Sequence, residues 1–438
     1  MREVRVGLVG WGTVGTGVVR LLRKHAADIR RRLGVPLRLA AIADLDLERD
    51  RGVRVDRRIL TRDARAVVRD PSIDVVVELI GGYEPAKTLV LEAIRAGKAV
   101  VTANKALLAV HGNEIFRAAE RARVHLGFEA SVGGGIPILR ALRESLVGDR
   151  NRAVYGIVNG TCNYLLTTMT REGAEFPEVL RRAQAEGLAE ADPSFDVDGI
   201  DSAHKLTLLV QLAFGRRIRF EDIPTEGIRS LTALDIAFAT ELGYVIKLLA
   251  IAKTEDGKTV EARVHPTMIP EGHPLADVSG AFNAIVVAGD ALGPSMYIGQ
   301  GAGMMPTATA VVADLVDAAR NRILGVPLRW PPLGLPFAEI PEARVRPLDD
   351  LVCRYYLRVQ AVDRPGVLAK ISAILGREGI SIASVLQKAR RSGSSVPVVL
   401  LTHEAREKHL RRALGRIARL PVVRGRPQVV RIEERLGT

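Results

Sequence analysis

Residues 10–15 read Gly-Trp-Gly-Thr-Val-Gly, a G-x-G-x-x-G pattern that follows an apolar run at residues 4–9 and precedes a helical stretch. In this setting the first glycine permits a tight turn, the second lets the backbone approach a pyrophosphate, and the third allows close packing of helix on strand. A glycine-rich turn without a ligand is the alternative, and the flanking strand and helix argue against it. Gly10, Gly12 and Gly15 are therefore predicted to bind a dinucleotide at a helix N-terminus.

Residues 1–130 continue this unit as a Rossmann-type, doubly wound α/β domain. Short runs rich in Val, Leu, Ile and Ala alternate with helical stretches, as expected for a parallel sheet whose strands are buried on both faces. The predicted strands are residues 4–9, 37–43, 75–79, 99–102 and 124–128. A late helix at residues 307–324 is expected to return to this domain as part of segment 304–325.

The pattern changes in residues 131–303, where longer helices are mixed with strands. This predicts an α+β domain for catalysis, substrate binding and dimerisation. The predicted helices include residues 202–214 and 233–253, and the predicted strands include residues 152–158 and 284–288.

Residues 326–348 contain six of the chain's 22 prolines, which predicts a linker. Residues 349–438 then alternate strand, helix, two strands, helix and strand, the βαββαβ order of a ferredoxin-like domain. The predicted strands are residues 355–362, 381–387, 396–401 and 429–433, and the predicted helices are residues 366–377 and 406–420.

The composition is that of a globular protein, with 47% hydrophobic and 26% charged residues. The net charge of +13 is spread over the chain and aromatic residues make up only 4%, so nucleic-acid binding is not expected. The positive charge is instead expected to attract an anionic cofactor. Cys162 and Cys353 lack metal-site or disulfide spacing. With no expected leader or membrane span, we predict a cytoplasmic protein.

Asp44 ends the second predicted strand, where a carboxylate accepts hydrogen bonds from the adenosine ribose hydroxyls and favours NAD. Arg49 and Arg51 lie nearby and are able to pair with a 2′-phosphate, so NADP stays an alternative. A turn-forming or helix-capping role for Asp44 is a second alternative.

Further polar residues follow the strand ends, where ligands bind in open parallel sheets. Lys105 comes directly after the fourth strand and points either to solvent or to the ligand crevice. Glu129 precedes a glycine-rich loop with free carbonyls, which indicates either a site for a hard cation or a hinge between domains. Asp201 and Lys205 stand four residues apart on one helix, either as a pair that moves a proton or as a surface salt bridge.

Six longer motifs resemble those of the homoserine dehydrogenases over nearly the full chain. They are GLVGWGTVG at 7–15, TANKALLA at 102–109, FEASVGGGIPI at 128–138, NGTCNYLLTTM at 159–169, AEADPSFDVDGIDSAHKL at 189–206 and GAGMMPTATAVVADL at 301–315. The resemblance implies an NAD(P)-dependent oxidoreductase that interconverts L-aspartate 4-semialdehyde and L-homoserine, in the biosynthesis of threonine, methionine and isoleucine. An amino-acid-binding regulatory protein that has lost catalysis is the alternative.

The resemblance also implies roles for individual residues. Lys205 would exchange the proton with the substrate oxygen, Lys105 would assist there and near the nicotinamide, and Asp201 would orient the reacting group. Glu190 would bind the substrate ammonium and Asp196 would support the same pocket. The remaining implied contacts are Thr13, Val14 and Gly303 to the cofactor, and Glu129, Val132, Gly134 and Ile136 to a sodium ion.

Two departures from the family pattern bear on these roles. Many members that use NADP have Arg where this chain has Ala43, which weakens the case for NADP, and a frequent Tyr is replaced by Leu188. The C-terminal segment resembles an ACT domain, with Asp363 to Leu368 as its first turn. That resemblance implies an amino-acid effector, which we expect to be threonine, and a homodimer or homotetramer; a domain that only stabilises the oligomer is the alternative.

Overall fold

The N-terminal apolar runs form a six-stranded parallel sheet in the order β3-β2-β1-β4-β5-β6 in the computed structural model, which describes residues 3–387 and 395–437. The strands are β1 Val4–Val9, β2 Leu37–Ala43, β3 Leu60–Thr61, β4 Val75–Glu78, β5 Ala99–Thr102 and β6 Leu126–Gly127. The predicted strands are thus confirmed, although β6 is shorter than expected and the two-residue β3 was not predicted. The strand order reverses beside β1, which places a ligand crevice between the ends of β1 and β4.

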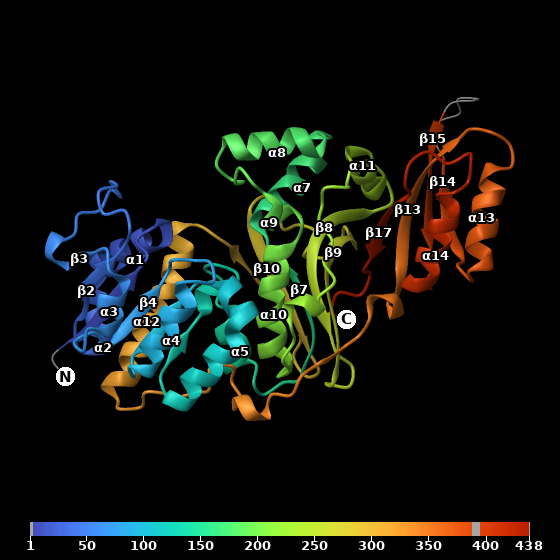
Figure 1. The fold of residues 1–438 in the computed structure, drawn as a ribbon. Coiled ribbons are helices and arrows are strands. Elements are labelled where there is room, and N and C mark those ends of the chain that lie inside the picture. The colour runs from blue at the N-terminus through green and yellow to red at the C-terminus, as the bar shows by residue number, and fades with distance from the viewer. Residues whose placement is uncertain (1–2, 388–394, 438) are drawn as a thin grey trace.

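Helices cover both faces of this parallel sheet. They are α1 Thr13–Lys24, α2 Ala26–Leu33, α3 Ala64–Arg69, α4 Ala86–Arg95, α5 Lys105–Ala122 and, from late in the chain, α12 Met304–Ile323. Helix α12 lies against α1 in Figure 1, as an orange helix among blue elements. Ala308, Val311 and Leu315 of α12 are fully buried in one cluster with Val4, Val6 and Leu8.

A second, mixed sheet of eleven strands runs through the rest of the molecule. Its first part consists of β7 Asn151–Ile157, β8 Tyr244–Lys253, β9 Thr259–Pro270, β10 Phe282–Gly289 and β11 Gly293–Gln300. The C-terminal part adds β13 Val352–Val362, β14 Ile382–Leu386, β15 Ser395–Thr402 and β17 Gln428–Ile432, while the short β12 Arg344–Val345 and β16 Ala405–Arg406 pair with β9 and β13. The two parts join because β17 pairs with β9 in parallel, with Arg431 opposite Thr267.

The predicted helix over residues 233–253 is half wrong. Helix α11 spans only Ala233–Glu241, and residues 244–253 form β8, a central strand between β7 and β9. Gly243 ends the helix with a φ of +79°, a conformation that favours glycine. The run that follows is apolar at almost every position, and such a pattern does not by itself distinguish a buried strand from a buried helix.

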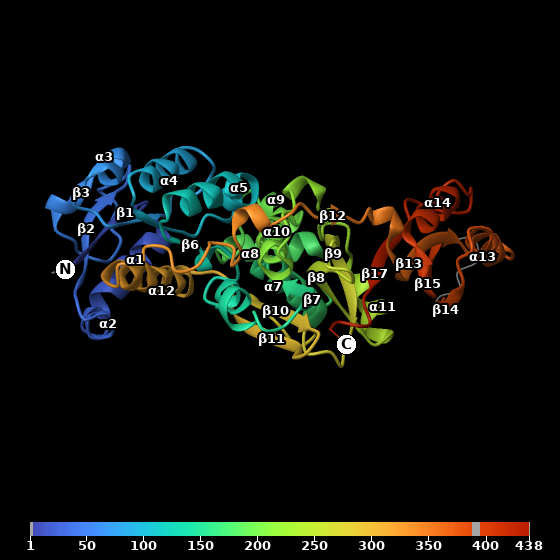
Figure 2. The same ribbon diagram turned by 90° about the horizontal axis from the view of Figure 1, so that it is seen from below.

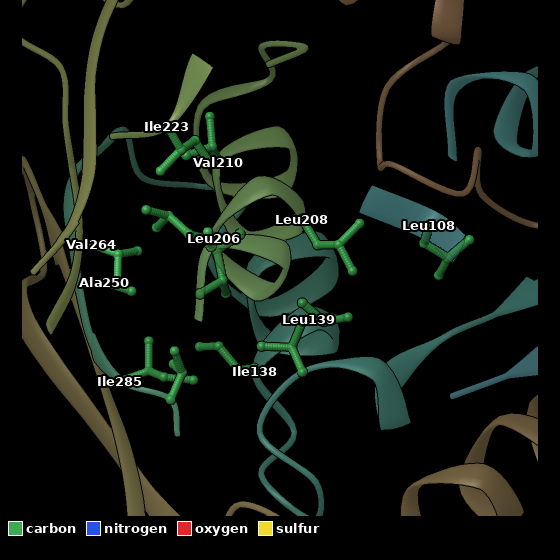
Figure 3. Packing of buried hydrophobic residues seen from close by; sticks show 14 of the residues in the cluster. Leu108, Ile138, Leu139, Leu206, Leu208, Val210, Ile223, Ala250, Val264 and Ile285 are labelled. Atoms are coloured by element: carbon green, nitrogen blue, oxygen red, sulfur yellow. The ribbon is translucent and has the colours of Figure 1, made fainter. Parts of the chain in front are cut away.

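Helix α10, Ile200–Phe214, lies between the mixed sheet and the N-terminal part, and every residue from Asp201 to Ala213 is buried. Figure 3 shows Leu206 and Val210 packed towards Ala250, Val264 and Ile285 of the sheet, while Leu208 points towards Leu108 of α5. The other helices of this part are α6 Ile138–Arg140, α7 Gly160–Glu172, α8 Phe176–Ala185 and α9 Ser194–Val197. Burial of each such leucine stabilises the fold by about 1.5–3 kcal/mol.

The C-terminal part has the predicted ferredoxin-like fold. Its strands lie in the order β17-β13-β15-β14, with α13 Val367–Arg377 and α14 Glu407–Ile417 packed on one face. Figure 2 shows the three parts in a row, with the chain end returning towards β7 and β10. There, the Tyr155 hydroxyl donates to the Arg435 carbonyl at 3.0 Å. Within the described ranges, no helix has the length and apolar character needed to cross a membrane.

Candidate active site

The glycine-rich turn leaves room where a pyrophosphate would approach. Gly10 has a φ of +99°, and a Cβ at this position would lie 2.6 Å from the Leu79 carbonyl oxygen. A Cβ on Gly15 would lie 2.3 Å from the Gly10 oxygen, whereas a Cβ on Gly12 would meet no atom within 4 Å. Helix α1 begins at Thr13. The chain therefore offers backbone amides beside open space, the arrangement that receives a dinucleotide phosphate.

A cavity of about 310 Å³ continues from this turn along the ends of β1, β2 and β4. Gly10, Gly12, Asp44, Leu45 and Arg62 are among its lining residues. Its size and its mainly apolar wall fit the adenosine half of a dinucleotide. Arg62 is exposed and was not considered in the sequence analysis, because its position beside Asp44 depends on how the 45–62 segment folds back.

Asp44 is held by the protein itself. Its Oδ2 accepts the Trp11 N–H at 2.5 Å, and its Oδ1 accepts the Asp46 N–H at 2.9 Å. The Arg51 guanidinium lies 3.4 Å from Asp44 Oδ1, donates to the Trp11 carbonyl and covers the Trp11 ring. Asp44 therefore has the turn-forming contacts of the alternative interpretation, and its carboxylate also borders the cavity.

Lys105, Asp201 and Lys205 lie together at the junction of the two sheets. Lys105 is the first residue of α5 and approaches Asp201 Oδ1 at 3.1 Å. Lys205 donates to Asp201 Oδ2 at 2.7 Å and to the Val158 carbonyl at 2.6 Å. Asp201 and Lys205 are only 3% and 7% exposed. They are not a surface salt bridge, and Asp201 links a helix of the parallel-sheet part to the buried helix α10.

Burial and charge act against each other in this group. Burial alone would raise the pKa of Asp201, but the two lysines outweigh it and hold that pKa well below its usual range. Burial lowers the pKa of Lys205, and the Asp201 charge offsets this only in part. For Lys105 burial is outweighed by Asp201, so its pKa is raised. Lys205 therefore loses its proton more readily than Lys105.

Two more predicted residues border the lysines. Asp196, in α9, and the exposed Glu190 are close enough for their charges to raise the pKa of Lys105, after Asp201. Asn159 was not predicted from the sequence; its amide donates to Asp196 at 2.7 Å and to Asp201 at 2.8 Å. Its place at the start of the NGTCNYLLTTM motif, before a helix, was the available signal.

The predicted cation loop lies against the segment before α12. A Cβ on Gly134 would lie 2.6 Å from the Gly301 carbonyl carbon, and the Gly135 N–H donates to the Gln300 carbonyl at 3.2 Å. The Glu129 carboxylate accepts the N–H groups of Leu139 and Arg140 at 2.9 and 2.8 Å. Burial, aided by Asp314, raises the pKa of Glu129 to about 7. Each of its oxygens keeps a second acceptor position.

Val132 and Ile136 flank these glycines and are buried, while Gly303 ends the segment that the loop contacts. Gly303 immediately precedes α12, whose Met304 carbonyl would lie 2.6 Å from a Cβ on Gly17 in α1. The start of α12 therefore lies beside the helix that follows the glycine-rich turn. Among residues 3–387 and 395–437, no group of three or more His, Cys, Asp and Glu side chains is placed to hold a metal ion.

A separate cavity of about 300 Å³ lies in the C-terminal part, at the turn between β13 and α13. Asp363, Arg364, Gly366 and Leu368 line it together with Gln387. The turn that carries the ACT resemblance therefore borders a space large enough for a small molecule.

Comparison with known proteins agrees with this architecture. Sequence models match residues 10–129 as the homoserine dehydrogenase NAD-binding domain, 137–316 as homoserine dehydrogenase and 355–421 as an ACT domain. The homoserine dehydrogenase of Neisseria gonorrhoeae is 45% identical over 99% of both chains. That of Pseudomonas aeruginosa is 46% identical over 99% of this chain and all of its own.

Solved structures give the same result. The crystal structure of a homoserine dehydrogenase from Thiobacillus denitrificans has a TM-score of 0.92, with 46% identity over 99% of both chains. A hyperthermophilic archaeal homoserine dehydrogenase solved in complex with NADPH has a TM-score of 0.61 and 26% identity over 72% of this chain and 97% of its own. The glycine-rich cofactor turn, the lysine pair on Asp201 and these full-length matches agree: the chain belongs to the homoserine dehydrogenase family.

Proposed function

We propose that the protein catalyses the NAD(P)-dependent interconversion of L-aspartate 4-semialdehyde and L-homoserine at the Lys105–Asp201–Lys205 group. The observation that carries this proposal is the contact of one buried carboxylate with two lysines from different parts of the fold. Gly10, Gly12, Thr13, Val14, Gly15 and Gly303 would hold a nicotinamide dinucleotide, which would supply or accept the hydride. The protein residues hold the substrate and move the proton.

In this proposal Lys205 gives its proton to the aldehyde oxygen during reduction and takes it back from the alcohol during oxidation. Lys105 and the ammonium of Lys205 stabilise the negative charge that develops on that oxygen. Asp201 keeps both lysines in place, Glu190 binds the substrate ammonium, and Asp196 supports the same pocket. The burial of Lys205 suits this role, because burial lowers the pKa of its ammonium group and so makes the proton easier to transfer.

The test is the initial rate of homoserine oxidation by the purified protein and its Lys205→Ala variant. We expect the variant to lose turnover by about 100-fold or more while the affinity for the cofactor, measured by quenching of reduced-nicotinamide fluorescence, stays within about twofold. Turnover that survives within a few-fold would show that Lys205 does not move the proton. No homoserine-dependent reduction by the parent protein would favour a regulatory protein without catalysis.

The proposal extends to the coenzyme, for which NAD is expected to be preferred. The Asp44 carboxylate borders the adenosine cavity, where it would accept ribose hydroxyls and repel a 2′-phosphate, and Arg51 is already engaged by Asp44 and backbone carbonyls. Arg62 is the residue that we expect to support any use of NADP. The ratio of kcat/KM for NAD and NADP, in the parent and in Arg62→Ala, checks this: the variant should lose NADP activity selectively.

A sodium ion is expected at the loop after Glu129, with the Glu129 side chain and the carbonyls of Val132, Gly134 and Ile136 as oxygen ligands. The residues fit such an ion, because a buried carboxylate lies beside irregular backbone that turns at Gly133 and Gly134. Sodium chloride should then raise the melting temperature more than choline chloride at equal ionic strength. Equal effects of the two salts would argue against the site.

The ACT domain provides a place for an amino-acid effector, which we propose to be threonine, at the cavity beside the turn from Asp363 to Leu368. We further propose a cytoplasmic homodimer or homotetramer. Threonine should lower the rate of homoserine oxidation, and light scattering coupled to size exclusion should give twice or four times the mass of the 47.4 kDa chain. An Arg364→Ala variant that remains equally sensitive to threonine would place the effector elsewhere.

A further inference from the structure

Asn159 is the second of the two residues between strand β7, which ends at Ile157, and helix α7, which begins at Gly160. Its side chain is 4% exposed. The amide oxygen accepts the N–H of Cys162 at 2.8 Å and so caps the helix. Because the oxygen is committed to this cap, the NH2 group must point away from α7, towards the acidic segment at 190–201.

The NH2 group uses both of its hydrogens there. One goes to Asp196 Oδ1 at 2.7 Å and the other to Asp201 Oδ2 at 2.8 Å. The same Asp201 oxygen accepts the Lys205 ammonium, and its Oδ1 faces Lys105. A neutral amide thus holds two carboxylates beside one another, although their charges repel. It shares Asp201 Oδ2 with Lys205 and leaves Oδ1 to Lys105.

The first turn of α7 makes two more contacts, one with the acidic segment and one with Leu188 just before it. The Cys162 thiol donates to the Asp196 carbonyl at 3.2 Å, and the Thr161 hydroxyl donates to the Leu188 carbonyl at the same distance. The acidic segment therefore packs against the N-terminal end of helix α7. Asn159 is the residue at that end whose side chain contacts Asp201.

We propose that Asn159 is a positioning residue for the reaction: it holds Asp196 and Asp201 in the one arrangement in which Asp201 contacts Lys105 and Lys205 together. The inference rests on the proposed roles of Lys205 and Asp201. It goes further, because it assigns the geometry of the Asp201 contacts to the amide that caps the neighbouring helix α7.

The test is Asn159→Asp, which keeps the size of the side chain and its helix cap but exchanges the NH2 donor for a second carboxylate oxygen. The ionisable groups around Lys205 are Asp196, Asp201, Lys105, His204 and Cys162. An added negative charge among them favours the ammonium form of Lys205. We expect kcat for homoserine oxidation to fall by about tenfold or more, and the pH midpoint of kcat to move upwards, while KM for NAD stays within about twofold.

Asn151→Asp is the matched control. Asn151 begins the same strand β7, and its amide donates to the Ala213 carbonyl at 3.1 Å, away from both lysines. The same chemical change there should leave kcat and the pH profile as in the parent. If Asn159→Asp matches this control, or loses activity with an unshifted pH profile, Asn159 has only a structural role and the inference is wrong.

A second variant covers the case in which Asn159→Asp does not fold. Asn159→Ser keeps a capping hydroxyl but cannot reach both carboxylates, and it should lower kcat/KM for homoserine by about tenfold without weakening NAD binding. Parental kcat/KM in this variant would overturn the inference. Lys205→Ala, measured alongside, separates the two proposals. If Lys205→Ala remains active, the proposed catalytic site is wrong. If Lys205→Ala is inactive but Asn159→Ser has the kcat/KM of the parent, only the role of Asn159 is wrong.

Discussion

At the residue scale, the Asp201 carboxylate influences the pKa values of both Lys105 and Lys205. Asp201 raises the pKa of both lysines, but the more deeply buried Lys205 still has a lowered pKa while that of Lys105 is raised. A difference of this kind, produced by environment alone, is how one site assigns different tasks to two like groups.

The pH dependence of turnover should follow from this difference. In the proposed mechanism oxidation needs Lys205 without its proton, so kcat for oxidation should rise with pH through a midpoint below the ordinary lysine value of about 10.4. Asp201→Asn removes the charge that favours the ammonium, so the midpoint should move to lower pH. The measurement is kcat against pH for both proteins; an unmoved midpoint would mean that Lys205 is not the titrating group.

The glycine-rich turn allows binding and folding to be separated. A Cβ on Gly12 meets open space and the residue has a negative φ of −75°, whereas Gly10 has a φ of +99° and its Cβ would collide with backbone. Gly12→Ala should therefore change the free energy of unfolding by less than about 0.5 kcal/mol yet weaken NAD binding, because the methyl group fills the pyrophosphate space. Gly10→Ala should both lower the free energy of unfolding and weaken NAD binding. Equal NAD affinity in Gly12→Ala and the parent would contradict the placement of the cofactor.

At the level of elements, patterns that repeat locally were predictable and those set by distant partners were not. The strands of the parallel sheet follow from their apolar runs, and the Asp201–Lys205 pair follows from helical spacing. Strand β8 does not, because a run that is buried on all sides has no periodicity to separate strand from helix. Asn159 was missed because its partner Asp201 is 42 positions away. No spacing rule connects residues that only the packed fold brings together.

Helix α10 lends itself to a test of how packing supports the site. Leu208 is fully buried and points towards Leu108 of α5, one turn from Lys205 and between the elements that carry the two lysines. Leu208→Ala should lower the free energy of unfolding by about 2–5 kcal/mol and also reduce kcat, since the Lys105–Asp201 contact crosses this boundary. Leu234→Ala, at a leucine that is 39% exposed, is the control and should change little in urea denaturation or turnover. Equal behaviour of the two variants would show that the boundary is not rigid.

At the scale of the whole molecule, the buried Arg431 connects the ACT domain to the catalytic part, where its partner Glu226 is exposed. Arg431 of β17 bonds Glu407 of α14 at 2.7 Å and Glu226 of the catalytic part at 2.8 Å. The segment after Glu226 continues to Ile228, whose N–H donates to the Val197 carbonyl, next to Asp196. A chain of contacts therefore runs from α14 through Arg431 and Glu226 to Val197, which follows Asp196.

Removal of Arg431 should be costly, because it leaves Glu407 buried without its main partner. Arg431→Ala is expected to lower the free energy of unfolding by about 3–5 kcal/mol and to weaken the response of activity to threonine. Arg411 pairs with the same glutamate but its side chain is 51% exposed, so Arg411→Ala should cost no more than about 1 kcal/mol. Denaturant titration and threonine inhibition of both variants measure this; a parental threonine response in Arg431→Ala would mean that coupling runs elsewhere.

The pairing of β17 with β9 has a consequence for anyone who wishes to study catalysis without regulation. Shortening the protein to its first two parts would strip Thr267 and Met268 of the strand that now covers them, and would also withdraw Leu436 from the outer face of the central sheet. An uncovered strand edge recruits strands from other molecules. The shortened enzyme is thus expected to precipitate. If the effector binds at the ACT cavity as proposed, point changes there, and not deletion, are the route to an enzyme that does not respond to it.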